Sequence, residues 1–277
     1  MIKMSHQVGK HLQVFFIHIK KTSGTSFRNM LYDVFKSEQI YPTPSDLTST
    51  GNIYATPNYL MEMKGQGKLI NINVLCGHYP FILGEKIFTH PTYITFLRHP
   101  IERTLSVIEQ HKNMNAIEIK QLIKSTSKIT SGRFIFPEIK QDTSYEEALD
   151  SQEFVECLIK NYQTKIFAVN TLDEAPDTLN ISFRINDLAY QRAIERLDLL
   201  DVIGLTEEFN TSIQLIESEL DIKFPTLRYL NRSKNQNKRN KLNQKLVNKI
   251  IDLTEYDIRL YEEAVKRFYN QIYNSKM

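Results

Sequence analysis

The chain has 277 residues, a length that fits one large α/β domain or two smaller ones. With 41% hydrophobic and 24% charged residues it can bury a core, which excludes a disordered or collagen-like chain. The formal net charge of +3 does not call for nucleic acid, and two cysteines, Cys76 and Cys157, cannot build a disulfide framework.

The sequence contains no candidate membrane span. No apolar run approaches the roughly 18–20 residues that cross a bilayer. The run VFFIHI near the N-terminus is too short for a secretion signal, and no small-residue cleavage site follows it. We therefore expect a protein without a membrane span, located in the cytoplasm.

Predicted strands and helices alternate along the chain. Short apolar runs rich in β-forming residues predict buried strands over 12–19, 69–76, 92–97 and 201–205. Apolar residues that recur every three or four positions predict helices over 25–35, 100–111, 145–162, 186–198 and most of 242–273. Strands that alternate with helices form a parallel sheet covered on both faces. The sequence therefore predicts an α/β fold with a central parallel sheet.

Several details of this organisation are also predicted. We treat residues 1–277 as a single domain, in which 41–58 and 112–145 are expected to be variable segments, on the acceptor side or forming a lid. Thr206 is expected to cap the helix after the fourth strand. In the last helix, a core-facing stripe is expected at Ile258, Tyr261, Val265, Phe268 and Ile272.

The turn after the first predicted strand has the composition of an anion-binding site. The free N–H groups of a helix's first turn and the helix dipole both attract anions. Gly24 allows close backbone approach, and Lys21 supplies a mobile charge beside Lys20. Hydroxyl groups available to donate hydrogen bonds belong to Thr22, Ser23, Thr25 and Ser26. An ordinary strand–helix connection with a surface lysine pair remains an alternative.

The common nucleotide motifs are absent from this turn. In the Walker A pattern GxxxxGK[ST] the lysine follows the second glycine, whereas here Lys21 precedes the turn's single glycine. The sequence also lacks GxGxxG, so a dinucleotide fold is poorly supported.

Two further segments place reactive side chains directly after predicted strands. Arg98 follows the third strand, at the end where open α/β sheets bind ligands, and its planar guanidinium suits a phosphate. Ser106 falls two helical turns further on and can share that site. A structural salt bridge is the alternative for Arg98.

A histidine follows the second predicted strand. His78 lies in the turn GHYP, and imidazole accepts a proton near neutral pH, so His78 is a candidate general base. A packed structural histidine is the alternative for His78, and is the interpretation that we favour for His18. Cys76 and His78 form the single close Cys/His pair, so no metal site is predicted.

Six segments in order resemble one family. IHIKKTSGTSF (17–27) resembles the 5′-phosphosulfate loop IHIPKTGGTSF of the Golgi-type carbohydrate sulfotransferases and their bacterial relatives, with the heparan sulfate 2-O-sulfotransferases the closest kind. TFLRHPIERTLSVIEQH (95–111) resembles the family's 3′-phosphate segment, and CGHYPF (76–81) its GHxxF turn. Later segments that fit are NYQTKIFA (161–168), VIGLTEEFNTSIQLI (202–216) and DIRLYEEAVKRF (257–268).

The resemblance implies a fold and an activity. It implies a P-loop-like, three-layer sulfotransferase that uses 3′-phosphoadenosine 5′-phosphosulfate (PAPS) and releases adenosine 3′,5′-bisphosphate. Lys21 would stabilise the leaving group, residues 20–26 would hold the 5′-phosphate, and Arg98 with Ser106 would hold the 3′-phosphate. His78 aligns with the histidine that the family uses. Three residues depart from the family pattern: Lys20 replaces a proline, Ser23 a glycine and His99 an aspartate.

The basic stretch 228–249 contains a further match. Asn231, Arg232 and Ser233 resemble a late family loop, LNxS, that closes over the donor, although a solvated loop and helix face is an equal alternative. Nucleic-acid binding is not expected, because Tyr229 is the single aromatic residue among these charges and stacking platforms use several. Residues 161, 163, 164 and 165 are expected to touch the acceptor, to brace the site, or simply to pack in a helix.

The sequence thus predicts a PAPS-dependent sulfotransferase acting on a hydroxyl group, of a glycan by resemblance or of another small molecule. Two alternatives remain open: a nucleotide-dependent kinase on the same architecture, and a non-catalytic nucleotide- or glycan-binding module. The acceptor, the sulfated position and the oligomeric state are not predicted.

Overall fold

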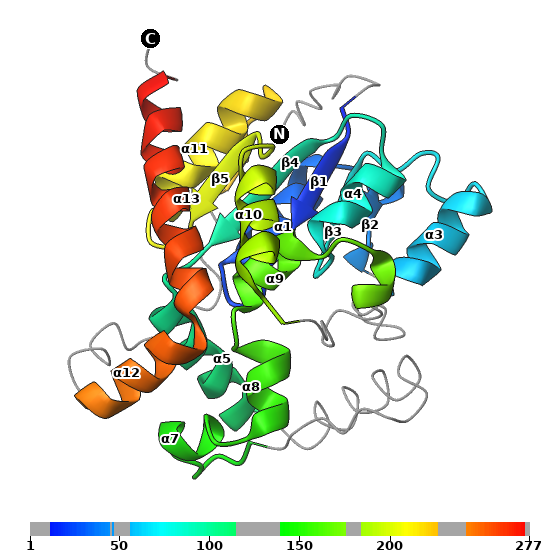
Figure 1. The fold of residues 1–277 in the computed structure, drawn as a ribbon. Coiled ribbons are helices and arrows are strands. Elements are labelled where there is room, and N and C mark those ends of the chain that lie inside the picture. Colours follow the sequence, from blue (N-terminus) through cyan, green and yellow to red (C-terminus); the bar gives the residue numbers. More distant parts are fainter. Residues whose placement is uncertain are drawn as a thin grey trace.

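A computed structural model describes residues 12–44, 46, 56–114, 139–175, 184–226 and 242–274. Its centre is a five-stranded, wholly parallel sheet with the strand order β2-β3-β1-β4-β5 (Figure 1). The strands are β1 (Val14–Ile17), β2 (Ile40–Tyr41), β3 (Val74–Gly77), β4 (Thr92–Leu97) and β5 (Val202–Leu205). This confirms the predicted α/β fold of P-loop-like, three-layer type.

The helices connect these strands and cover both faces of the sheet. The α-helices that precede β5 are α1 (Gly24–Val34), α3 (Pro57–Gly65), α4 (Phe81–Ile87), α5 (Pro100–Lys112), α7 (Tyr145–Ala148), α8 (Gln152–Leu158), α9 (Tyr162–Ala168) and α10 (Asp187–Leu197). Those that follow it are α11 (Phe209–Leu220), α12 (Gln244–Leu253) and α13 (Glu255–Asn274). Short 3₁₀ turns are η1 (Ser37–Gln39) and η3 (Leu172–Glu174).

The sequence missed the strand at one edge of the sheet. β2 has only two residues, which pair with β3 at Ile40↔Val74 and Tyr41↔Leu75. A strand of two residues is too short to show the alternation that marks a strand, and its second residue, Tyr41, falls in the predicted variable segment 41–58. Most of that segment lies outside the described residues.

Alternating residues of the strands build two hydrophobic clusters, one on each face of the sheet. Phe15 and Ile17 of β1 point to a cluster that includes residues of α3, α4, α9, α10 and α13. Val14 and Phe16 point to the opposite cluster, formed with α1 and α11. Because successive strand residues face opposite sides, both faces of the central strand are buried, as expected for a parallel sheet.

A third cluster lies beyond the sheet. It joins apolar residues of α5, α7, α8 and α12, among them Leu105, Phe154 and Ile250. These helices lie together in Figure 1, below the ends of the strands in that view. They extend the molecule on the side where the parallel strands end.

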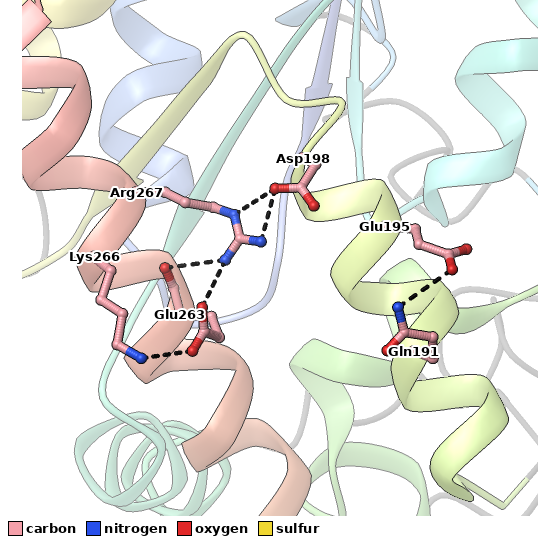
Figure 2. A network of polar contacts seen from close by, with 6 residues as sticks. All are labelled: Gln191, Glu195, Asp198, Glu263, Lys266 and Arg267. Carbon is pink, nitrogen blue, oxygen red and sulfur yellow. Dashed lines mark hydrogen bonds and ion pairs between the residues drawn. The ribbon is translucent and has the colours of Figure 1, made fainter.

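The core-facing stripe of α13 agrees with the predicted one at Phe268 and differs from it at the other positions. Its buried residues are Asp257, Leu260, Ala264 and Phe268, whereas Tyr261, Val265 and Ile272 are only partly buried against the core. The prediction followed apolar residues and so passed over Asp257, a carboxylate with no exposed surface. On the outer side of α13, Arg267 bonds Asp198, just after α10, and Glu263 of its own helix (Figure 2).

Candidate active site at the carboxyl edge of the sheet

Side chains from four strand ends converge at one edge of the sheet. In register, Ile17 of β1 pairs with Gly77 and with Thr95, and Leu97 pairs with Leu205. The residues just beyond these positions therefore leave the sheet at the same edge. They include the turn after β1, His78 after β3, Arg98 after β4 and Glu207 after β5. This is the edge at which open α/β sheets bind ligands.

The turn between β1 and α1 has a specific backbone conformation. Lys21 and Ser23 both adopt the left-handed region, with φ of 67° and 65°. The Thr22 hydroxyl donates to the carbonyl of Ile19 over 2.9 Å, and the Ser23 carbonyl accepts from the N–H groups of Ser26 and Phe27. The hydroxyl hydrogen of Thr22 is thus used inside the turn rather than offered to a ligand.

This conformation leaves an unpaired row of donors. Among the residues that the structure describes, the N–H groups of Thr22, Ser23, Gly24 and Thr25 meet no backbone or side-chain acceptor. They lie at the N-terminus of an eleven-residue helix with no acidic residue in its first turn. Free N–H groups and an uncompensated helix dipole together favour a bound anion.

Gly24 is required by a neighbouring side chain. A β-carbon at this position would lie 1.9 Å from Cδ2 of His18, so the imidazole occupies the space beside the glycine. His18 is buried as predicted, stacks on Phe16 with ring centroids 5.5 Å apart, and contacts the His78 ring at 4.3 Å. The close approach at Gly24 is therefore made by His18.

His78 is oriented by a backbone carbonyl. Its Nδ1 lies within hydrogen-bond distance of the His18 carbonyl oxygen, which can only accept, so Nδ1 carries the hydrogen and Nε2 keeps its lone pair. Loss of water contact lowers the pKa of His78 well below its usual range, and the charge of Lys20 lowers it further. A half-buried, neutral imidazole with a free Nε2 lone pair has the protonation state of a general base.

Lys21 and Arg98 bring two cations together. The Arg98 Nη1 donates to the backbone carbonyl of Lys21 over 3.3 Å. Burial and the nearby Arg98 charge lower the pKa of Lys21, and burial also lowers the pKa of Arg98. Neither cation forms a salt bridge with a described carboxylate. Two adjacent cations with free N–H groups beside them are the groups that could hold a highly charged anion.

The segment 161–168 braces the site. Gln163, which has no exposed surface, bonds both the N–H and the carbonyl of Arg98, and Lys165 donates to the Glu156 carbonyl. The same polar region includes the fully buried Arg103, which the sequence reasoning did not select. Its guanidinium donates to the Leu158 carbonyl and lies over the Tyr162 ring at 4.5 Å.

Other predicted residues have different outcomes. Ser106 is half-buried on α5 and stays a prediction as a phosphate ligand, as do the side chains of Lys20 and Ser26. Asn231, Arg232 and Ser233 lie outside the described residues. The prediction for Thr206 is wrong: α11 begins only at Phe209 with Glu208 at its N-cap position, and Thr206 instead donates its N–H to Leu97.

Two further findings concern the described part of the chain. It contains no cluster of three or more His, Cys, Asp or Glu side chains that could hold a metal ion. No helix within it is both long enough and apolar enough to cross a membrane.

Comparison with known proteins defines the class of the protein. The model of the sulfotransferase family matches residues 7–262, so the chain belongs to the sulfotransferase family. Over 101 residues it is 27% identical to a heparin sulfate O-sulfotransferase of Drosophila melanogaster. That match covers 35% of this chain and 29% of the fly protein, so the chain aligns with less than a third of that relative.

Proposed function

We propose that the protein is a PAPS-dependent sulfotransferase that acts on a hydroxyl group of a carbohydrate. Membership of the sulfotransferase family supports the transfer of a sulfuryl group. The row of free N–H groups at α1, flanked by Lys21 and Arg98, is the observation that best supports PAPS as the donor. A donor with phosphate groups at both ends of a ribose matches two cationic positions on neighbouring strand ends.

The residues of the turn would hold the 5′-phosphate end of the donor. The N–H groups of residues 22–25 would bind its oxygens, with Lys20, Ser23, Thr25 and Ser26 beside them. Arg98 and Ser106 would bind the 3′-phosphate, because a guanidinium offers a planar fork to phosphate oxygens. Asn231, Arg232 and Ser233 would close over the nucleotide.

Two side chains would act on the reacting atoms. The donor supplies a sulfuryl group, and a new sulfur–oxygen bond to the acceptor hydroxyl forms as the bond to the 5′-phosphate breaks. Nε2 of His78 would take the proton of that hydroxyl. Lys21 would stabilise the negative charge that grows on the departing phosphate, which is where preorganised charge lowers a barrier most.

Burial keeps His78 neutral by lowering its pKa, and its cationic neighbours lower the pKa further. The charges of Lys20 and Arg28 both lower its pKa in the unliganded protein. A bound anion beside these cations would offset them and raise the pKa of His78 toward neutrality. The base would therefore become strongest once the donor is in place.

A carbohydrate acceptor is proposed from the relatives. The fly protein is named as an O-sulfotransferase of heparin sulfate, and the six matching segments resemble carbohydrate sulfotransferases.

Calorimetric titration tests the donor. We expect adenosine 3′,5′-bisphosphate to bind and ADP with magnesium not to bind. Binding of ADP·Mg alone would favour a kinase. Bisphosphate binding without transfer to a panel of glycans and small hydroxyl compounds would favour a non-catalytic binding module.

A further inference from the structure

Residues 98 and 99 lie between the end of β4 and the start of α5. The His99 carbonyl accepts from Arg103 of α5, but neither element accepts a hydrogen bond from the N–H groups of the two residues. β4 ends at Leu97, and α5 begins at Pro100, which has no N–H of its own. Arg98 nevertheless has to present its guanidinium at a fixed place if it is to bind a phosphate. Its peptide groups must therefore be held from outside the strand and the helix.

Two side chains from distant parts of the chain provide these bonds. Gln163 accepts from the N–H of Arg98 over 3.1 Å and donates to its carbonyl over 2.9 Å. Glu207 accepts from the N–H of His99 over 3.0 Å. The partners are 65 and 108 positions away in sequence. The amide of Gln163 thus bonds Arg98 much as a neighbouring strand would.

Both side chains are in turn anchored to α13. The backbone N–H of Gln163 donates to the carboxylate of Asp257 over 3.1 Å. The same carboxylate accepts from the N–H of Thr164 over 2.7 Å and from its hydroxyl over 2.8 Å. Glu207 is held by the hydroxyl of Tyr261, which donates to Oε2 over 3.0 Å.

The link between α9 and α13 is reciprocal. Asp257 of α13 satisfies N–H groups in the first turn of α9, while Asn161, just before α9, accepts from the N–H groups of Tyr256 and Asp257. Each helix start is therefore capped by a side chain from the other. Arg103, also fully buried, adds a positive charge that lowers the pKa of Asp257, against the larger effect of burial, which raises it.

We propose that Gln163 is a positioning residue for Arg98: fixed by α13 through Asp257, its amide sets the direction from which Arg98 reaches the donor's 3′-phosphate. The proposal rests on the function proposed above for Arg98. It explains why a neutral amide is buried without any exposure beside a phosphate site: it is bonded on both sides to the peptide groups of the phosphate-binding residue.

The test compares two glutamines that make the same kind of contact. Gln271 of α13 accepts from the N–H of Ile203 over 3.2 Å and donates to the carbonyl of Asp201 over 2.8 Å, at β5 and away from Arg98. Methionine has a similar length and replaces neither bond. Gln163→Met and Gln271→Met therefore lose equivalent hydrogen bonds, and only the first is expected to affect the site.

Binding is measured by calorimetry with adenosine 3′,5′-bisphosphate and with adenosine 5′-monophosphate. We expect Gln163→Met to weaken bisphosphate binding about tenfold, the effect of losing one or two hydrogen bonds. Binding of the monophosphate, which lacks the group that Arg98 contacts, should change little, and Gln271→Met should change neither ligand. In an Arg98→Ala background the Gln163 effect should disappear, because the two residues act as one unit.

Amide hydrogen exchange of the unliganded protein gives an independent readout. The Arg98 N–H should exchange faster in Gln163→Met and at the wild-type rate in Gln271→Met. Unchanged exchange at Arg98, or equal weakening of both nucleotides, would overturn the proposal. If Gln163→Met does not fold, Gln163→Glu, which keeps the acceptor and loses the donor, is measured in its place. If the wild type binds no bisphosphate, the proposed function fails, and the exchange data still decide whether Gln163 positions Arg98.

Discussion

The two turns that build the site are stabilised in opposite ways. The turn after β1 is held by bonds between near neighbours, such as Thr22 to Ile19 and Ser26 to Ser23, and by the packing of His18 against Gly24. The turn after β4 is held by side chains far along the chain, Gln163 and Glu207. A local turn keeps its shape through its own sequence, whereas a distantly held turn depends on the docking of helices.

The difference assigns different roles to the two turns. The first turn carries the strained backbone and the free N–H groups, and the carbonyl of His18 at its start contacts His78 of the turn after β3. The second carries Arg98, whose peptide groups are held by Gln163 of α9 and whose guanidinium donates to the Lys21 carbonyl. Side-chain substitutions in the first turn should therefore leave the backbone of Arg98 in place, and the Gly24→Ala variant below tests that separation.

The largest effect is expected for His78→Ala. Loss of a general base lowers turnover by about 10³-fold, whereas binding of adenosine 3′,5′-bisphosphate should stay near that of the wild type. Steady-state kinetics and calorimetry measure the two quantities, with the exposed His90→Ala as the control. A collapse of nucleotide binding would instead give His78 a structural role in the first turn.

The protonation state of His78 can be followed directly. Because burial and Lys20 lower its pKa well below the usual 6.5 of an imidazole, the ring stays neutral as the pH falls through that value. We expect the nuclear magnetic resonance signals of the His78 ring in the unliganded protein to show no titration step between pH 7.5 and about 6. A step near 6.5 would contradict the burial of this ring.

A somewhat smaller loss is expected for Lys21→Ala. Removal of one preorganised charge at the leaving group lowers turnover by about 10²-fold. Its effect on the Michaelis constant for the acceptor should be much smaller, because the interaction is strongest in the transition state. Lys36→Ala, an exposed lysine just after α1, is the control. Unchanged turnover would remove Lys21 from the mechanism.

The contrast between the turns also explains what the sequence could predict. Residues 20–26 are contiguous and lie between a strand and a helix, so their composition alone indicated an anion site. The hydrogen bonds that fix residues 98 and 99 could not be predicted, because their partners lie 65 and 108 positions away in sequence. For Gln163, bracing the site was only one of three alternatives. Asp257 was missed because an apolar period cannot reveal a buried carboxylate that caps another helix.

Most of the fold was predictable because its strands are also contiguous segments of the sequence. Runs such as Thr92–Leu97 are long enough to show their character, and this strand has the predicted bounds. β2, with two residues, was not detectable, and Thr206 was taken for a cap because the late start of α11 leaves no local mark. The features that the sequence did not predict were thus those that depend on contacts between distant segments.

Gly24→Ala tests the packing inside the first turn. The added methyl group would meet the His18 ring, and overpacking of this kind lowers the free energy of unfolding by about 1–3 kcal/mol. Gly65→Ala is the matched control, since no atom lies within 4 Å of a β-carbon there and alanine is the better helix former. Urea denaturation measures both. If the two turns are independent, the Arg98 N–H should exchange in Gly24→Ala at the wild-type rate, once the change in the free energy of global unfolding is taken into account.

The smallest effect is expected from relieving strain at Ser23. A non-glycine residue in the left-handed region costs about 1–2 kcal/mol, so Ser23→Gly should raise the free energy of unfolding by up to about 1 kcal/mol. Asp221→Gly is the control, because Asp221 is also left-handed, with φ of 49°, at the end of α11 and away from the site. Both variants should be stabilised, but only Ser23→Gly should alter nucleotide binding, because it changes the row of N–H groups at α1. Equal nucleotide binding in both variants would mean that the first turn holds its anion without help from the conformation of Ser23.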